Sequence, residues 1–418
     1  MSAATFTAAH GWRYGLLGLP LAFAALPLYV LLPNHYAREF GVPLAALGAL
    51  LLALRLLDAL VDPWLGRMVD RLFARSAAAV LRLGAASAAG LALGFALLFS
   101  PPTRDPQAVL AWAAFSLALT YLAYSTLAIA HQAWGAMLGG DAAQRGRVVA
   151  WREAFGLAGV LCASALPLVA GFPATAAALG LALLLGWTAW GSGMRPSVAK
   201  QLDSPGWRGP WQQPAFRRLF AVFVLNGIAS AVPATLVLFF VQDRLQAPVA
   251  MQPLFLVSYF LAAALAIPLW LRLVPRLGLE HTWIAGMLTA IAAFAGAAAL
   301  GAGDGGAFLL ICIASGAALG TDLALPAALL AGTIRARGHA GGGDGAYFGW
   351  WNLASKLNLA LAAGLALPLL ALAGYVPGSR DPAALRALAA AYTLLPCVLK
   401  AAAALLLYSL VRRHGRSE

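Results

Sequence analysis

The stretch at residues 44–71 reads LAALGALLLALRLLDALVDPWLGRMVDR and decides the fold, because it places charges inside a long apolar run. Arg55, Asp58 and Asp62 are spaced by three and four residues, so an α-helix puts them on one face. A charged side chain at membrane depth is costly and marks a functional site by default. A proline, a glycine and a basic cluster follow at once. The stretch predicts a membrane-spanning helix that carries an ion site and ends in a polar segment.

The composition is typical of a membrane protein built from helices. The 418 residues are 62% hydrophobic and 10% charged, with a mean hydropathy of +0.81, whereas soluble domains carry about 25% charged residues. Apolar runs of about 20 residues recur and do not alternate with period two, which favours helices over a β-barrel. The three cysteines lie within apolar runs without metal-ligand spacing. We therefore expect no disulfide framework, no metal and no other cofactor.

The net charge of +13 is explained by membrane orientation better than by nucleic acid. With both termini inside, nineteen of the 28 lysines and arginines fall in cytoplasmic segments, five fall outside and four lie within helices. The high alanine, leucine and arginine content is typical of a GC-rich bacterial genome. We expect a multi-pass monomer in the lipid of a bacterial inner membrane, with both termini cytoplasmic and no nucleic acid partner.

Twelve spans account for the apolar runs, with helix-breaking residues at the joints. The longest polar segment, 194–215, holds four prolines and scattered charges and is interpreted as a cytoplasmic linker. It divides an N-terminal six-helix bundle, 1–193, from a C-terminal six-helix bundle, 216–418. The predicted spans are 13–33, 44–64, 79–99, 108–136, 147–170, 174–193, 216–241, 252–272, 282–300, 307–332, 346–373 and 384–411.

The two halves carry similar segments at equivalent places. PWLGR at 63–67 follows the second span, and PLWLR at 268–272 closes the eighth. Two pseudo-symmetric halves are typical of secondary transporters that rock about a central site. Opposite charges at similar depth on several helices also predict one shared interior site, since each would be prohibitive alone in lipid. We therefore expect an all-α polytopic transporter.

Two motifs in the opening stretch resemble a known superfamily. The segment from Gly66 to Arg75, with Asp70 and Arg71 inside it, resembles the loop between helices 2 and 3 of the major facilitator superfamily. The pattern D-x-x-x-D-P-x-x-G, which begins at Asp58, is more specific and is similar to the glycoside–pentoside–hexuronide:cation symporters, the family of the melibiose carrier. The resemblance implies the major facilitator fold and cation-coupled transport. It also implies a gating role for Gly66, Asp70, Arg71 and Arg75.

Further landmarks extend the resemblance over nearly the whole chain. AWREAFGLAG at 150–159 is similar to the family's helix 5 with its buried arginine, here Arg152. GAYFGWWNLASK at 345–356 is similar to helix 11 with its buried lysine, here Lys356. Tyr124 matches an aromatic position of the family's sugar site.

The chain departs from this pattern where the family binds sugar and sodium. The first span has no acid in YGLLGLP at 14–20, and Val61 and Ala128 stand where polar side chains are usual. Fewer oxygen ligands make a full hard-cation shell difficult to build. The coupling ion is therefore H⁺ or Na⁺, with the balance slightly toward the proton, because two carboxylates held close favour uptake of a proton or cation.

The candidate site residues form two groups. We assign Asp58, Asp62 and Ser125 to the cation or proton site. The solute site combines a guanidinium and an ammonium, which suit a carboxylate or phosphate, with polar and aromatic neighbours. Its members are Tyr124, Arg152, Asp322, Trp351, Asn352 and Lys356. These residues also have structural interpretations. The two aspartates could form static ion pairs with Arg55 and Arg152, and Asp322 could form one with Lys356. The aromatic residues could simply pack in the helix bundle.

The sequence predicts a secondary active transporter and not an enzyme: cation-coupled symport of a small polar solute, such as a sugar, glycoside or organic anion, by alternating access. The alternative is a carrier of lysophospholipids or other amphiphiles with the same fold, because the absence of an acid in the first span would suit an apolar tail. A membrane prenyltransferase also uses D-x-x-x-D but needs a second aspartate-rich segment, which this sequence lacks. A non-transporting scaffold or sensor on this fold is the remaining alternative.

Overall fold

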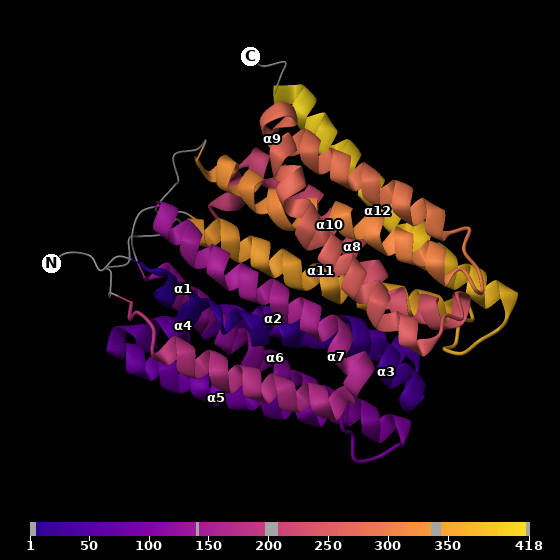
Figure 1. Cartoon of the computed structure of the whole chain (residues 1–418), viewed down its shortest axis with the longest axis horizontal. Coiled ribbons are helices and arrows are strands. Elements are labelled where there is room, and N and C mark those ends of the chain that lie inside the picture. The colour runs from indigo at the N-terminus through magenta and orange to yellow at the C-terminus, as the bar shows by residue number, and fades with distance from the viewer. Residues whose placement is uncertain (1–5, 139–141, 197–207, 336–343, 415–418) are drawn as a thin grey trace. The chain divides into compact units, whose positions relative to one another are not determined.

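The computed structural model describes residues 6–138, 142–196, 208–335 and 344–414, and this part of the chain contains helices and turns but no strand (Figure 1). The first half holds α1 (Ala8–Gly15), α2 (Gly18–Leu26), the π-helix η1 (Pro27–Leu31), α3 (Leu32–Glu39), α4 (Leu44–Arg75), α5 (Ala77–Leu98), α6 (Pro106–Ala136) and α7 (Ala142–Gly191). The second half holds η2 (Pro210–Gln212), α8 (Pro214–Phe239), the π-helix η3 (Phe240–Arg244), η4 (Val249–Met251), α9 (Gln252–Ala297), α10 (Gly305–Arg335), α11 (Asp344–Leu372) and α12 (Pro382–His414).

The described residues include ten helices long and apolar enough to cross a membrane. Two of them, α7 and α9, each consist of two helical segments that meet at a glycine, Gly171 with φ 79° and Gly278 with φ 80°. Side chains rarely adopt a positive φ, so glycine permits both kinks. With each of these two helices counted as two segments, the described residues contain twelve such segments, the number that the sequence predicts, and both kinks fall at predicted joints.

The chain forms two compact units. The first comprises Met1–Leu32, Glu39–Val42 and Ala53–Lys200, and the second comprises Pro33–Arg38, Pro43–Leu52 and Gln201–Glu418. The units differ from the two bundles expected from the sequence, since two short pieces of the N-terminal half group with the second unit. Of the expected linker, 194–215, residues 197–207 lie outside the described part of the chain.

In the first unit, α1 and α2 pack on α7, while α5 packs on α6 and α7. Glycines allow the close approach of α2 to α7. A Cβ on Gly18 would lie 2.6 Å from the carbonyl oxygen of Arg152, and one on Gly159 would lie 2.2 Å from that of Leu19. Small residues let two helix backbones approach closely in a membrane, where packing drives association. This packing positions Arg152 beside the first helices of the chain.

In the second unit, α10 packs on α9, and α12 packs on both α8 and α9. A buried apolar cluster joins these helices to α11 and includes Phe216, Trp283, Leu330 and Tyr347. Here too a glycine permits backbone approach, because a Cβ on Gly316 would lie 2.2 Å from the carbonyl oxygen of a residue in α9. Polar side chains inside this unit are therefore held by four tightly packed helices.

Candidate functional site

A buried ion pair lies in the middle of α4. Arg55 Nη1 donates to Asp58 Oδ2 at 3.0 Å, and the two side chains are only 3% and 2% exposed. The spacing of three residues places both on one face of the helix, as the sequence predicts. The guanidinium also lies over two rings, with Cζ 4.4 Å from the ring centroid of Tyr29 and 4.0 Å from that of Tyr121. Tyr29 belongs to η1, and π-helical turns frequently occur at functional sites.

Asp58 has a second partner on α6. Ser125 Oγ donates to Asp58 Oδ1 at 2.6 Å, and Ser125 is itself 2% exposed. Asp58 is therefore a buried carboxylate held by donors from two helices, α4 and α6. Asp62 lies one turn further along α4 and is half-buried. The structure thus brings Asp58 and Ser125 into direct contact, with Asp62 one turn away.

Two of the predicted solute residues belong to the same unit. Tyr124 precedes Ser125 on α6, is half-buried, and lies within electrostatic range of Arg55, Asp58 and Arg152. Arg152 on α7 forms an ion pair with its neighbour Glu153 at 2.6 Å, and its side chain is 26% exposed. Arg152 therefore pairs with the neighbouring carboxylate on α7 and not with the aspartates of α4, as the static-pairing alternative would require.

Asp322 on α10 lies at the centre of a polar cluster in the second unit. Its Oδ1 accepts from Asn226 Nδ2 at 2.9 Å and from Trp283 Nε1 at 2.8 Å. Its Oδ2 accepts from Lys400 Nζ at 2.8 Å and from Ser230 Oγ at 3.2 Å. Lys400 Nζ also donates to Asn226 Oδ1 at 2.7 Å. Four bonds fill the acceptor sites of the carboxylate, so the cluster joins α8, α9, α10 and α12.

This geometry corrects the predicted partner of Asp322. The sequence suggested that Asp322 neutralises Lys356, but its ion pair is with Lys400, whose side chain is 5% exposed. Lys400 is one of the four basic residues that the sequence analysis placed within helices. Linear spacing could not identify the pair, because it depends on α12 packing beside α9 and not on sequence separation. The candidate role of Asp322 as a solute ligand is weakened, since its oxygens are occupied.

The three predicted solute residues on α11 differ in exposure. Trp351 is 6% exposed and stacks on Phe223, with ring centroids 3.7 Å apart. This contact accounts for Trp351 as a packing residue of the second unit. Lys356 is half-buried, and Asn352, one turn earlier, is exposed. Of these two polar side chains, Asn352 is the more accessible.

The predicted gating segment is helical and not a loop. α4 continues without a break through Pro63 and Gly66 to Arg75, so the expected end of the span at residue 64 is wrong. Long helices accept proline when neighbouring groups satisfy the freed backbone. Arg71 and Arg75 are exposed, and a Cβ on Gly66 would meet open space. The side chain of Asp70 lies outside the described part of the structure.

A further buried carboxylate, Asp243 in η3, was missed by the sequence analysis. It is 1% exposed and forms an ion pair with Arg38 of α3, between Oδ1 and Nη2 at 2.6 Å. Its Oδ2 accepts from the Tyr375 hydroxyl and from the Gly378 amide, the latter at 2.9 Å. Its backbone carbonyl accepts from Arg380 Nη1 at 2.9 Å. Asp243 thus ties α3 and η3 to the connection between α11 and α12.

The sequence offered one usable signal for this cluster. Arg38 and Arg380 are two of the five basic residues that the sequence places outside the membrane, and both contact Asp243. Burial, reinforced by the bond to Asp243, raises the pKa of Tyr375 above its ordinary value, so the hydroxyl keeps its proton and remains a donor.

The class of protein follows from these features together. Apolar spanning helices with buried charges, arranged in this fold, define a multi-pass membrane transporter of the major facilitator type. The chain belongs to the family of MFS/sugar transport proteins, which it matches over residues 13–410. Members of this family and the solved neighbours below are transporters and not enzymes.

Two curated relatives are symporters of Escherichia coli (strain K12). The chain is 29% identical over 163 residues to the inner membrane symporter YicJ, a match that covers 38% of this chain and 34% of YicJ. It is 30% identical over 159 residues to the candidate glycoside/cation symporter YagG, covering 37% of this chain and 34% of YagG. Each match spans about a third of the relative's length. The resemblance to glycoside and cation symporters is confirmed.

Solved transporters share the fold at low identity. A point mutant of the nucleoside transporter NupG gives a TM-score of 0.71 at 13% identity and covers 96% of this chain and 98% of that chain. A bacterial homologue of the human lysosomal transporter Spinster gives 0.68 at 12% identity and covers 97% and 96%. A bacterial homologue of the iron transporter ferroportin gives 0.65 at 15% identity and covers 94% and 98%. These likenesses confirm the major facilitator fold.

Proposed function

We propose that the protein is a cation-coupled symporter of a small polar solute and that Asp58 is its coupling group. The observation that carries the proposal is the buried carboxylate of Asp58, held inside a span by Arg55 at 3.0 Å and by Ser125 at 2.6 Å. The curated relatives, one named as a symporter and one as a candidate glycoside/cation symporter, support the class of transport.

The pairing of Asp58 with Arg55 supplies a switch. Leaving one partner of a buried ion pair uncompensated costs about 3–5 kcal/mol. When a cation or proton binds Asp58, Arg55 loses its counter-charge. Arg55 must then either move away or be compensated by other contacts. Arg55 keeps its position in that event, because Tyr29 and Tyr121 hold the guanidinium by cation–π contact. Ion binding at Asp58 thus changes the local charge without moving the arginine far.

The proton is the proposed coupling ion, with sodium as the alternative. A sodium shell requires several oxygen ligands, as hard cations do. Near Asp58, the structure supplies the carboxylate, Ser125 Oγ and, one turn on, the carboxylate of Asp62. Val61 and Ala128 have apolar side chains at positions where the family resemblance implies polar ones. A proton needs no such shell.

The proposed solute ligands are Tyr124, Arg152, Lys356 and Asn352. All four are polar side chains on spanning helices; Tyr124, Arg152 and Lys356 are half-buried, and Asn352 is exposed. A guanidinium and an ammonium favour a carboxylate, phosphate or acidic sugar, while Tyr124 offers a ring face to a sugar. A small polar solute such as a glycoside or an organic anion is the proposed substrate class, carried by alternating access.

The proposed setting is the inner membrane of a bacterium, with both termini in the cytoplasm and the monomer as the transporting unit. The bias of basic residues supports this orientation. Reporter fusions at the two termini and after residue 102 test it, since the first two should report the cytoplasm and the third the opposite side.

Gradient-driven uptake into proteoliposomes tests the proposed function. Purified protein would be offered labelled glycosides, organic acids, amino acids and lysophospholipids under an imposed proton or sodium gradient. The proposal expects accumulation of a polar solute by the wild type and by Asp105→Asn, whose exposed acid caps α6 and can be replaced by asparagine. It expects no accumulation by Asp58→Asn. Uptake of lysophospholipids alone would favour the amphiphile carrier, and unchanged accumulation by Asp58→Asn would reject the coupling role.

A further inference from the structure

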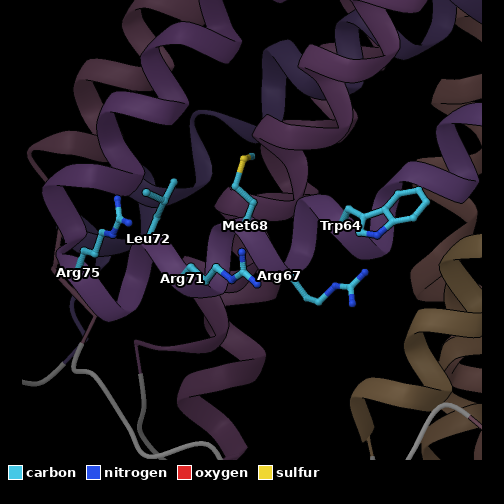
Figure 2. Close-up of a pocket in the computed structure, with 6 residues that line it drawn as sticks. All are labelled: Trp64, Arg67, Met68, Arg71, Leu72 and Arg75. Atoms are coloured by element: carbon cyan, nitrogen blue, oxygen red, sulfur yellow. The ribbon is translucent and has the colours of Figure 1, made fainter.

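The terminal part of α4 carries a groove that includes two of the predicted gating residues, Arg71 and Arg75, and that the proposed ion and solute sites do not explain. It has a volume of about 430 Å³ and is lined by six residues of this single helix (Figure 2). They form two rows at helical spacing. Trp64, Met68 and Leu72 make the apolar row, and Arg67, Arg71 and Arg75 make the basic row. Residues three and four apart are neighbours on a helix surface, so each arginine lies beside an apolar side chain.

The groove continues an exposed apolar strip along the same helix face. Leu57 is 52% exposed, Leu60 is 66% exposed and Trp64 is 61% exposed, each three or four residues from the next. The strip runs from Leu57 to Arg67 over ten residues, or roughly 15 Å at 1.5 Å per residue. That length equals half of a hydrocarbon core about 30 Å thick. The face is therefore apolar over the depth of one leaflet and basic beyond it.

The three arginines are exposed, and none forms an ion pair with another described residue. Arginine forks bind phosphate oxygens in pairs and are weakly hydrated. Clusters of basic residues at the end of a spanning helix attract anionic headgroups. Trp64 lies where the apolar strip meets the basic row, the position that tryptophan prefers at a membrane interface.

We infer that this face of α4 is a binding site for one anionic phospholipid of the surrounding membrane. The phosphate and its headgroup lie against Arg67, Arg71 and Arg75, and an acyl chain lies along Leu57, Leu60 and Trp64. Charge complementarity and the length of the strip favour a lipid over a free anion, since a free anion would make no favourable contact with the apolar strip. Under the proposed orientation, the lipid belongs to the cytoplasmic leaflet.

The corresponding part of α9 also has exposed leucines, Leu261, Leu265 and Leu269, but it lacks an exposed tryptophan beside its arginines and supplies a control. Trp270 of α9 turns inward and donates from Nε1 to the carbonyl of Ala317 at 2.7 Å. Arg272 and Arg276 are exposed on the same helix, as is Arg217 at the start of α8. Replacing these three arginines removes the same charge as replacing the three of α4 but leaves the inferred site intact.

Native mass spectrometry of the protein in neutral detergent tests the inference. Phosphatidylglycerol and phosphatidylcholine with the same chains are titrated separately. The wild type and the R217Q/R272Q/R276Q variant should retain one phosphatidylglycerol in preference to phosphatidylcholine. The R67Q/R71Q/R75Q variant should bind it about tenfold or more weakly. Equal retention by this variant and the wild type would overturn the inference, as would equal binding of both lipids by the wild type.

Three further arms use the wild type and one single-residue variant, so the result does not depend on a variant that folds poorly. Raising KCl from 0.05 to 0.5 M should weaken retention of phosphatidylglycerol and leave phosphatidylcholine unchanged. Trp64→Ala should weaken binding of long-chain phosphatidylglycerol severalfold more than that of a six-carbon analogue. Displacement of the lipid by 10 mM inorganic phosphate at constant ionic strength would overturn the inference in favour of a free-anion site.

Discussion

Replacing Ser125 by alanine separates the two coupling ions, because the two ions predict changes of opposite sign. Ser125 Oγ donates to Asp58 Oδ1 at 2.6 Å in a fully buried setting. A hydrogen bond to a charged group contributes about 1.5–3 kcal/mol, which is roughly a 10- to 100-fold change in an equilibrium constant. The donor stabilises the charged carboxylate, so its loss favours the protonated acid. For a sodium site, in contrast, the hydroxyl oxygen is a ligand, and its loss weakens ion binding.

The assay is the cation dependence of solute uptake in proteoliposomes. With proton coupling, Ser125→Ala should move the half-maximal pH of uptake upward by about one to two units, because the acid binds its proton more tightly. With sodium coupling, the half-saturating sodium concentration should rise by roughly 10- to 100-fold.

Ser116→Ala is the matched control for this experiment. Ser116 is equally buried on the same helix, but its Oγ donates to the carbonyl of Trp112 at 2.7 Å and has no part in the ion site. Its replacement should leave both ion dependences within about twofold. If Ser125→Ala also leaves both within twofold in an active protein, the reasoning that links the hydroxyl to ion binding at Asp58 is refuted.

Three other perturbations follow from the buried polar clusters and helix contacts. Lys400→Met should destabilise the second unit by about 3–5 kcal/mol, because it leaves Asp322 buried without its cation; thermal unfolding in detergent should show this, with partial rescue by Asp322→Asn. Gly159→Leu should prevent folding, since its Cβ would lie 2.2 Å from a carbonyl oxygen of α2. Size-exclusion chromatography should show that this variant aggregates. The control variant Gly180→Ala, at a glycine of α7 with open space around it, should elute like the wild type. Tyr375→Phe should cost about 1–3 kcal/mol by removing a donor to Asp243. Because the pKa of Tyr375 is raised on folding, the wild type should lose this stability as pH rises above 10, and the variant should not.

The spans were predictable because apolar length and glycine or proline joints are local properties. Gly171 and Gly278 mark the two kinks, and both lie at the joints inferred from the sequence. The pair of Arg55 and Asp58 was also predictable, since a separation of three residues on one helix fixes the contact. The continuation of α4 past Pro63 was not, because a proline in a membrane helix can end it or be accommodated by its neighbours.

Contacts between distant helices required the structure. Nothing in the spacing of Asp322 and Lys400 pairs them, since α10 and α12 meet only through the packing of the second unit. The same holds for Arg38 and Asp243, which are separated by most of the first half of the chain. Ser125 was assigned to the ion site from the sequence. The structure puts its hydroxyl on Asp58, and the functional role stays a prediction.

Solute-evoked cation entry measures the central claim most directly. Proteoliposomes loaded with a pH dye or a sodium indicator would receive a transported solute from outside, with no imposed gradient. The wild type and Asp105→Asn should carry protons inward with the solute, whereas Asp58→Asn should give no cation signal. A cation signal from Asp58→Asn equal to that of the wild type would contradict the assignment of Asp58 as the coupling group.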